Sequence, residues 1–264
     1  MFKNFFRVLN LLSYADIATL TSAMLGFLAI TYIVDGSESS FLVAMLLIPI
    51  SAIIDGMDGA LARKFGTKHN YGKHLDSISD SICFGLAPSL LVYSLYYDLD
   101  KGPALDFINN DLEFQFRYNI DNIVAILSSF LVLMLSVLRL ARFTRGNQGG
   151  NKYFSGLPSP GLAIFIVVIS VKFSVVNDYD SVFVPLVIGF VSILSITTIP
   201  YAKARAQFKI PILFGILVLF STIILRYFEN DIWSTLWFAA FTLYMVYFAL
   251  LPFLISIDYF KNWI

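Results

Sequence analysis

Residues 41–63 read FLVAMLLIPISAIIDGMDGALAR and place a long apolar run directly before two aspartates and an arginine. About 20 apolar residues in an α-helix cross a hydrocarbon core roughly 30 Å thick. The segment therefore predicts a membrane-spanning helix that carries Asp55 and Asp58 to one membrane boundary.

The composition of the whole chain favours the same environment. Of its 264 residues, 58% are hydrophobic and only 14% are charged, whereas a soluble domain carries about 25% charged residues. A soluble helical bundle would need polar faces on its helices, and these are mostly missing. The sequence therefore predicts an integral membrane protein with a single membrane domain, residues 1–264.

Apolar stretches of membrane-spanning length recur along the chain. We expect an all-α, polytopic fold with about eight transmembrane helices, near residues 16–34, 41–63, 74–97, 120–143, 160–176, 181–199, 209–227 and 232–255. Residues 1–14 are basic and amphipathic and lack a signal cleavage site, which predicts an interfacial helix before the first span.

The distribution of charge predicts the orientation. The positive-inside rule assigns to the cytoplasm the side on which most of the 18 basic residues fall, namely Lys3, Arg7, Arg63, Lys64, Lys68, Lys73, Arg139, Arg142, Arg145, Lys152, Lys203, Arg205, Lys209 and Lys261. The opposite side carries mostly acidic segments, such as residues 98–119. Both termini and the turn after the second helix are therefore expected in the cytoplasm. The net charge of zero points to no particular partner, and no nucleic acid is expected.

Four aspartates lie at helical spacings on either side of that turn. Offsets of three, four and seven residues share a helix face, which groups Asp55, Asp58, Gly59 and Ala62 on the second helix, and Asp76 and Asp80 on the third. A rise of 1.5 Å per residue places the four carboxylates about 4.5 to 13.5 Å below the turn. We therefore expect them to meet in one small volume.

Clustered anions at a membrane boundary repel each other and are costly to desolvate. Divalent cations remove that cost, and all-oxygen ligands suit Mg²⁺ or Mn²⁺. The small Gly59 and Ala62 let a nucleotide or a neighbouring helix approach the backbone, and Arg63 can reach a phosphate with its planar guanidinium. The alternative, that the carboxylates are solvated charges that merely flank the helices, does not account for their common spacing.

The pattern Asp55-x2-Asp58-Gly59-x2-Ala62-Arg63-x8-Gly72-x3-Asp76-x3-Asp80 resembles the signature of the CDP-alcohol phosphotransferase family. The resemblance implies a catalytic core of six helices in residues 15–200, followed by two extra helices in residues 201–264. It implies that Asp55, Asp58 and Asp76 hold a pair of metal ions on the CDP pyrophosphate. It also implies that Asp80 touches the metal site and acts as general base, and that Gly59 and Arg63 contact the nucleotide. Members of the family tend to form homodimers, which this sequence neither supports nor opposes.

Two positions depart from the family pattern. Three residues before the signature glycine, relatives often carry a small hydroxyl residue, and here His69 stands. Either Thr67 supplies that hydroxyl to the nucleotide site, or His69 donates the hydrogen bond itself. Thr19 and Ser22 lie in a segment where relatives often have Asn, Thr and Asn. These two residues either line the cytidine pocket or belong to an ordinary interfacial helix start.

A second basic cluster follows the fourth helix. Arg139 and Arg142 share a helix face, and Gly156 and Pro158 precede the fifth helix, whose free N–H groups could cap an anion. The basic pair would suit a serine carboxylate or an acceptor phosphate equally. The structural alternatives are positive-inside anchoring for the arginines and helix initiation for the prolines.

The stretches 139–143 and 154–160, RLARF and FSGLPSP, resemble the pattern of the membrane-embedded phosphatidylserine synthases, as does the later segment 200–209. The resemblance implies a serine-binding role for Arg139, Arg142, Gly156 and Pro158.

The resemblance therefore implies transfer of the phosphatidyl group from CDP-diacylglycerol to the hydroxyl of L-serine, which gives phosphatidylserine and CMP. The enzyme would work in contact with membrane lipids and use Mg²⁺ or Mn²⁺ as cofactor. One alternative is a transferase of the same family that uses glycerol phosphate, inositol or its phosphate, or an archaeal-type CDP-lipid donor. A second alternative is a small ion-coupled transporter. A transporter should spread its charges over several helices near the bilayer midplane, whereas here they gather at one boundary.

Overall fold

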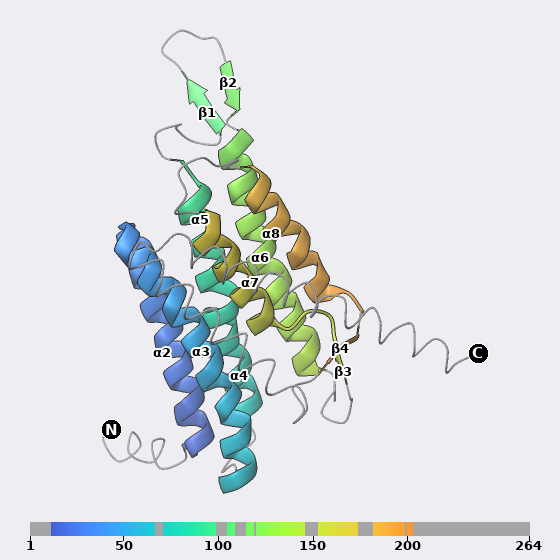
Figure 1. The fold of residues 1–264 in the computed structure, drawn as a ribbon. Coiled ribbons are helices and arrows are strands. Elements are labelled where there is room, and N and C mark those ends of the chain that lie inside the picture. Colours follow the sequence, from blue (N-terminus) through green and yellow to red (C-terminus); the bar gives the residue numbers. More distant parts are fainter. Residues whose placement is uncertain are drawn as a thin grey trace, which may run out of the picture.

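The computed structural model describes residues 12–66, 71–98, 105–108, 115–118, 120–145, 153–173, 182–198 and 200–202. In this part of the chain helices dominate and stand side by side in an elongated bundle (Figure 1). The predicted helical, membrane-embedded architecture is therefore confirmed in its coarse form.

Helices α2 (Tyr14–Asp35) and α3 (Glu38–Phe65) form a tight hairpin and pack along each other. The hydroxyl of Ser13 accepts a hydrogen bond from the Asp16 backbone N–H, and the Asp16 carboxylate accepts one from Ser13 in return, which makes a capping box. Ser37 caps α3 by accepting from the backbone N–H of Ser40. Because of this cap, α3 starts three residues before the apolar run.

The predicted third helix is continuous but not uniform. Helix α4 (Gly72–Asp80) passes directly into the π-helical turn η1 (Ser81–Leu86) and then into α5 (Ala87–Tyr96). Pro88 stands in the first turn of α5, where its missing N–H removes one helical hydrogen bond. A π turn rotates the helix face that follows it, and such turns are frequent at functional sites. Here the π turn comes immediately after Asp80.

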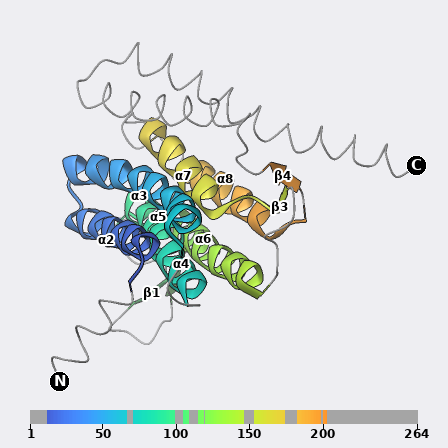
Figure 2. The same ribbon diagram turned by 90° about the horizontal axis from the view of Figure 1, so that it is seen from below.

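Helix α6 (Ile120–Arg145) packs on α5 and on α8 (Phe183–Ile193), which ends in the 3-10 turn η3 (Leu194–Ile196). Helix α7 (Ser159–Phe173) fills the space beside α3 and α5. Seen along the bundle, α2 and α3 lie on one side of α5, and α6 and α8 lie on the other (Figure 2).

Among the described residues, four helices are long and apolar enough to cross a membrane: Tyr14–Asp35, Glu38–Phe65, Gly72–Tyr96 and Ile120–Thr144. Two further apolar helices are shorter, Ser159–Val171 and Phe183–Ile196. The helices predicted at 209–227 and 232–255, and residues 1–11 of the predicted interfacial helix, lie outside the described residues. The prediction of eight transmembrane helices is therefore confirmed only in part.

Two short strand pairs, which the sequence did not predict, interrupt the helical pattern. β1 (Leu105–Ile108) pairs antiparallel with β2 (Gln115–Tyr118), and β3 (Tyr153–Ser155) pairs antiparallel with β4 (Pro200–Ala202). Strands of three or four residues show too few alternations to be recognised by periodicity. The β3–β4 pair matters for the site because it ties the segment before α7 to the segment after α8.

The buried core lies where α2, α3, η1, α5, α6, α7 and α8 meet. Its largest members include Phe84, Met45, Ile48, Leu91 and Ile166. Other large apolar side chains face outward, for example Phe27, Phe130 and Phe190. In water such a surface would favour association. In a bilayer these side chains contact acyl chains that are as apolar as they are, so the outer surface agrees with a membrane environment.

Candidate active site

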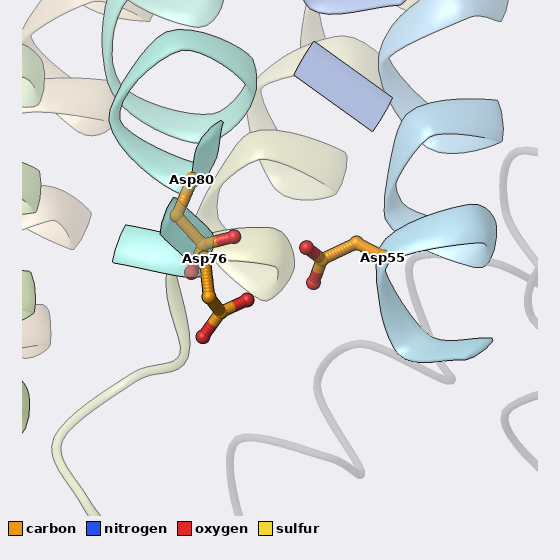
Figure 3. Close-up of side chains that lie close together, drawn as sticks. All are labelled: Asp55, Asp76 and Asp80. Carbon is orange, nitrogen blue, oxygen red and sulfur yellow. The ribbon is translucent and has the colours of Figure 1, made fainter. Parts of the chain in front are cut away.

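The end of the α3–α4 pair brings acidic side chains together across two helices. Asp55 reaches from α3 toward Asp76 and Asp80 on α4 (Figure 3). Each of the three offers a carboxylate oxygen, and these oxygens all lie within 4.8 Å of one another. We call Asp55, Asp76 and Asp80 the acidic cluster; it is the one group of this kind in the described part of the chain.

The acidic cluster contains buried oxygen atoms that have no hydrogen-bond partner in the described part of the chain. Oδ1 of Asp55 and Oδ1 of Asp80 are shielded from solvent and accept no hydrogen bond from any group that the structure describes. The carboxylates also repel one another, since Asp55 acts on both Asp76 and Asp80. Buried polar atoms normally have a partner, and buried charges are normally paired or bind a metal. The all-oxygen donor set and the orphaned atoms therefore fit a hard divalent cation.

Asp58, the fourth predicted ligand, lies next to the acidic cluster rather than inside the 4.8 Å group. Its charge acts on Asp76 and on Asp55. Its Oδ2 accepts a hydrogen bond of 2.8 Å from the hydroxyl of Thr19 on α2. The structure therefore assembles three of the four carboxylates tightly and holds the fourth beside them through a neighbouring helix.

The predicted nucleotide-binding residues follow Asp58 on α3. Gly59 and Ala62 are partly buried, and Arg63 is exposed. The Arg63 Nη1 atom lies 3.5 Å from the point where a Cβ on Gly59 would stand, which is ordinary van der Waals contact, so the guanidinium lies directly beside Gly59. Thr67 and His69 lie outside the described residues.

The two predicted pocket residues on α2 have different surroundings. The Ser22 hydroxyl is fully buried and donates to the backbone oxygen of Ser51 at 3.0 Å, while the Cys83 thiol donates to the backbone oxygen of Ser22 at 3.1 Å. Ser22 thus joins α2 to α3 and to η1. Thr19 instead faces Asp58. Of the two residues, only Thr19 contacts a predicted site residue.

Arg139 on α6 is buried beside the acidic cluster. Its Nη1 donates to Ser159 Oγ at 2.6 Å, and its side chain is only 6% exposed. Its Nε is buried and has no partner among the described groups. The positive charge acts on Asp80. Arg139 therefore has one donor, Nε, that is free of described partners near the carboxylates. The sequence could not show this arrangement, because it depends on how α6 packs against α4 and α7.

Arg142 makes a different kind of contact one turn further along α6. Its guanidinium donates to the backbone oxygens of Ser155 and Ile196 at 2.8 Å each, and to that of Thr197 at 3.4 Å. We call Arg142 with the segments 155–158 and 194–197 the basic corner. The carbonyls at the end of η3 lack helical partners, and Arg142 supplies donors to them.

Gly156 and Pro158 belong to the basic corner. Gly156 has φ +83°, and a Cβ there would collide with the backbone oxygen of Ser195, so only glycine fits this close approach. Pro158 lies directly before α7, and its carbonyl accepts the backbone N–H of Leu162. The backbone of Leu157 donates to Leu194 at 3.0 Å. These contacts fix the start of α7, and with it Ser159.

An acidic, all-oxygen cluster between apolar helices of membrane-crossing length defines a membrane protein with a candidate divalent-metal site. Residues 10–257 match the family model for CDP-alcohol phosphatidyltransferase, and the chain therefore belongs to this family. Its members are transferases of phospholipid biosynthesis that use divalent metals. The family agrees with the resemblance found in the sequence and favours a transferase over the transporter alternative.

Curated relatives carry names of serine-specific enzymes. The archaetidylserine synthase of Methanothermobacter thermautotrophicus is 32% identical over 199 residues, which cover 75% of this chain and 72% of the relative. The CDP-diacylglycerol–serine O-phosphatidyltransferase of Helicobacter pylori strain J99 is 27% identical over 220 residues, covering 81% and 82%. The relative of the same name from Methanocaldococcus jannaschii is 32% identical over 162 residues, covering 61% and 62%.

Proposed function

We propose that this chain transfers the phosphatidyl group from CDP-diacylglycerol to the hydroxyl of L-serine and releases CMP. The observation that carries the proposal is the acidic cluster, whose unpartnered carboxylate oxygens suit a divalent cation. The family to which the chain belongs, CDP-alcohol phosphatidyltransferase, supports the same chemistry. The names of the relatives support serine as the acceptor.

In this proposal Asp55, Asp58, Asp76 and Asp80 hold a pair of Mg²⁺ or Mn²⁺ ions. When bound, these ions supply charge neutralisation and a template for the pyrophosphate. Gly59, Ala62 and Arg63, with Thr67, form the nucleotide side of the site. Arg63 suits the pyrophosphate because its planar guanidinium matches phosphate oxygens in two places.

The reaction needs positioning and one base. Asp80 takes the proton of the serine hydroxyl, the serine oxygen forms a bond to the phosphorus that carries the diacylglycerol, and the bond from that phosphorus to CMP breaks. CMP leaves with the electron pair of the broken bond. Asp80 suits the role of base because it is the last residue of α4, lies near Arg139, and has an Oδ1 without a hydrogen-bond partner among the described residues.

The acceptor side of the proposed site is built on α6 and the start of α7. The Arg139 Nε has no partner among the residues that the structure describes, and its Nη1 is held by Ser159, so we assign to Arg139 the direct contact with the serine carboxylate. Arg142, Gly156 and Pro158 shape this side by fixing the basic corner. The sequence-based prediction that Arg142 contacts serine directly stays untested. Because its guanidinium donates to three backbone oxygens, the proposal gives Arg142 the structural role instead.

A second candidate function differs in the lipid donor. The archaetidylserine synthase among the relatives favours an archaeal-type CDP-lipid, which carries the same CDP headgroup on different chains. The acidic cluster would act on both donors in the same way, because its residues face the phosphates rather than the lipid tails. Other acceptors used in the family, glycerol phosphate and inositol phosphate, are the remaining alternatives.

The proposal also covers the orientation of the chain in the membrane and its domain organisation. Arg63, Lys64 and Lys73 lie near the α3–α4 turn, and the positive-inside rule then assigns the acidic cluster and both termini to the cytoplasmic side. Residues 15–200 would form the catalytic core, residues 1–14 an interfacial helix, and residues 201–264 two further helices. Reporter fusions at the two termini and in the 98–119 connection test the orientation, and light scattering of the purified protein tests a homodimer.

The decisive experiment measures CMP release by the purified protein in nanodiscs with each acceptor added in turn. L-serine should support release from CDP-diacylglycerol, whereas glycerol phosphate and inositol phosphate should not. A parallel series with an archaeal-type CDP-lipid separates the two donors. Release with glycerol phosphate but not serine would replace the acceptor, and activity that persists in the presence of chelators would remove the metal from the proposal.

A further inference from the structure

Helix α2 carries none of the four aspartates, yet it contacts both helices that do. Thr19 lies where the three helices meet and is 4% exposed. Its hydroxyl donates to Asp58 Oδ2 on α3 at 2.8 Å, and its backbone oxygen accepts a hydrogen bond of 2.9 Å from Ser79 Oγ on α4. Ser79 directly precedes Asp80 in the sequence. One residue of α2 therefore links the two acid-bearing helices.

The hydroxyl of Thr19 has a choice of acceptor. It lies 3.1 Å from the backbone oxygen of Ala15, one turn earlier in α2, and 2.8 Å from Asp58 Oδ2. A hydroxyl donates a single proton, and a hydrogen bond to a carboxylate is shorter and stronger than one to a neutral carbonyl. The proton is therefore directed at Asp58, and one oxygen of that carboxylate is held in a fixed direction.

We propose that Thr19 is a positioning residue for the metal site, which aims the second oxygen of Asp58 at a divalent ion. The inference rests on the proposed function, because it assumes that Asp58 binds such an ion. Asp58 lies outside the tight group of Asp55, Asp76 and Asp80, so its direction depends on a partner from another helix. Partners of this kind orient metal ligands, and their loss typically lowers metal affinity about 10- to 100-fold.

Burial makes the hydroxyl of Thr19 hard to replace. Thr19 and Ser79 are 4% and 2% exposed, so little water reaches the Asp58 carboxylate, itself partly buried, from the side of Thr19. In such surroundings a hydrogen bond to a charged group is stronger than in water. A valine at position 19 keeps the shape of threonine but removes the donor, and is therefore the sharpest change.

The experiment measures Mn²⁺ binding to the full-length protein in nanodiscs by electron paramagnetic resonance, without any lipid substrate. Thr19→Val should bind Mn²⁺ about 10- to 100-fold more weakly than the unchanged protein, whereas Thr19→Ser, which keeps the donor, should bind nearly as tightly. Thr21→Val is the matched control, because the Thr21 hydroxyl donates to the Ile17 backbone oxygen within α2. It should leave Mn²⁺ binding unchanged.

Each outcome separates the inference from the proposed function. If the unchanged protein binds no Mn²⁺, the metal site falls, and the role of Thr19 falls with it. If the unchanged protein binds Mn²⁺ and Thr19→Val binds it equally well, the metal site stands and the inference is overturned. A separate titration with CDP-diacylglycerol completes the test: weaker binding of this lipid with unchanged Mn²⁺ affinity would overturn the inference and place Thr19 on the nucleotide. An equal loss of Mn²⁺ affinity in Thr21→Val would also overturn it, because it would show a general weakening of α2.

A second variant protects the test against misfolding. Thr19→Val places a methyl group against the Asp58 carboxylate, and thermal unfolding shows whether the protein tolerates it. Thr19→Ala removes the hydroxyl without adding that methyl group. If Thr19→Val is unfolded, Thr19→Ala carries the same expectation for Mn²⁺, and wild-type affinity in Thr19→Ala overturns the inference.

Discussion

The acidic cluster and the basic corner differ in how the protein treats their charges. In the basic corner, Arg142 donates to three backbone oxygens from two segments. In the acidic cluster, Oδ1 of Asp55 and Oδ1 of Asp80 are buried with no partner among the described groups. Hydrogen bonds that the protein supplies to a charge help to stabilise the fold, whereas a cluster of charges without such partners is suited to bind a ligand of opposite charge.

The difference has an energetic consequence. Like charges brought together in a partly buried site lower the stability of the protein when no metal is bound. Hydrogen bonds from a charged group to backbone carbonyls raise the stability. Substitutions in the two regions should therefore have opposite effects: loss of function with retained stability in the acidic cluster, and loss of stability in the basic corner.

The largest effect is expected for Asp80→Asn. Loss of the general base should lower the rate of CMP release about 10²- to 10⁴-fold, while binding of CDP-diacylglycerol is retained. Without added metal, the thermal unfolding temperature should not fall, because the substitution removes a repelling charge. Glu38→Gln, at the opposite end of α3, is the control and should keep full activity. Near-normal turnover of Asp80→Asn would show that the base is misassigned.

Arg142→Ala should instead lower the stability of the protein. Loss of its hydrogen bonds to the backbone should lower the free energy of unfolding by about 2–3 kcal/mol, which thermal unfolding in nanodiscs measures. Lys73→Ala removes a single exposed hydrogen bond to the Thr144 backbone oxygen and should cost only about 1 kcal/mol. Unchanged stability of Arg142→Ala with a selective rise in the KM for serine would place Arg142 on the substrate and break the comparison.

Asp76→Asn should act through the metal. Removing one charged ligand of the acidic cluster should raise the Mn²⁺ concentration needed for half-maximal activity by at least about 10- to 100-fold. Activation curves after treatment with a chelator measure this shift, and added Mg²⁺ or Mn²⁺ should restore the chelated wild-type protein. An activation curve that coincides with that of the wild type would contradict the assignment of Asp76 as a ligand.

The smallest effect is expected for Arg139→Lys, which keeps the charge but loses the planar guanidinium. The KM for serine should rise about tenfold, the equivalent of one hydrogen bond between charged groups, and the KM for CDP-diacylglycerol should change little. Ser159→Ala removes the hydroxyl that holds Arg139 and should shift the KM for serine in the same direction by a smaller factor. Equal rises in both KM values would place Arg139 on the lipid phosphates.

Local patterns in the sequence predicted much of the helical framework. The apolar runs before Asp55 and around residues 120–143 gave helices close to the observed α3 and α6, with boundaries corrected by caps such as Ser37. The spacing of Asp76 and Asp80 placed both on one face of a helix, and the structure brings them near Asp55. The strand pair β3–β4 and the π turn after Asp80 were not predicted, because neither has a local signal of sufficient length.

The sequence by itself determined that the chain spans a membrane, belongs to a transferase family and carries carboxylates at the ends of two successive helices, because hydropathy and helical spacing are properties of neighbouring residues. Only the tertiary structure decided which charges have partners. Thr19 and Asp58 are 39 positions apart, and Arg142 and Ile196 are 54 apart. Such pairs depend on how helices pack against one another, and that packing sums many weak contacts that no short pattern records.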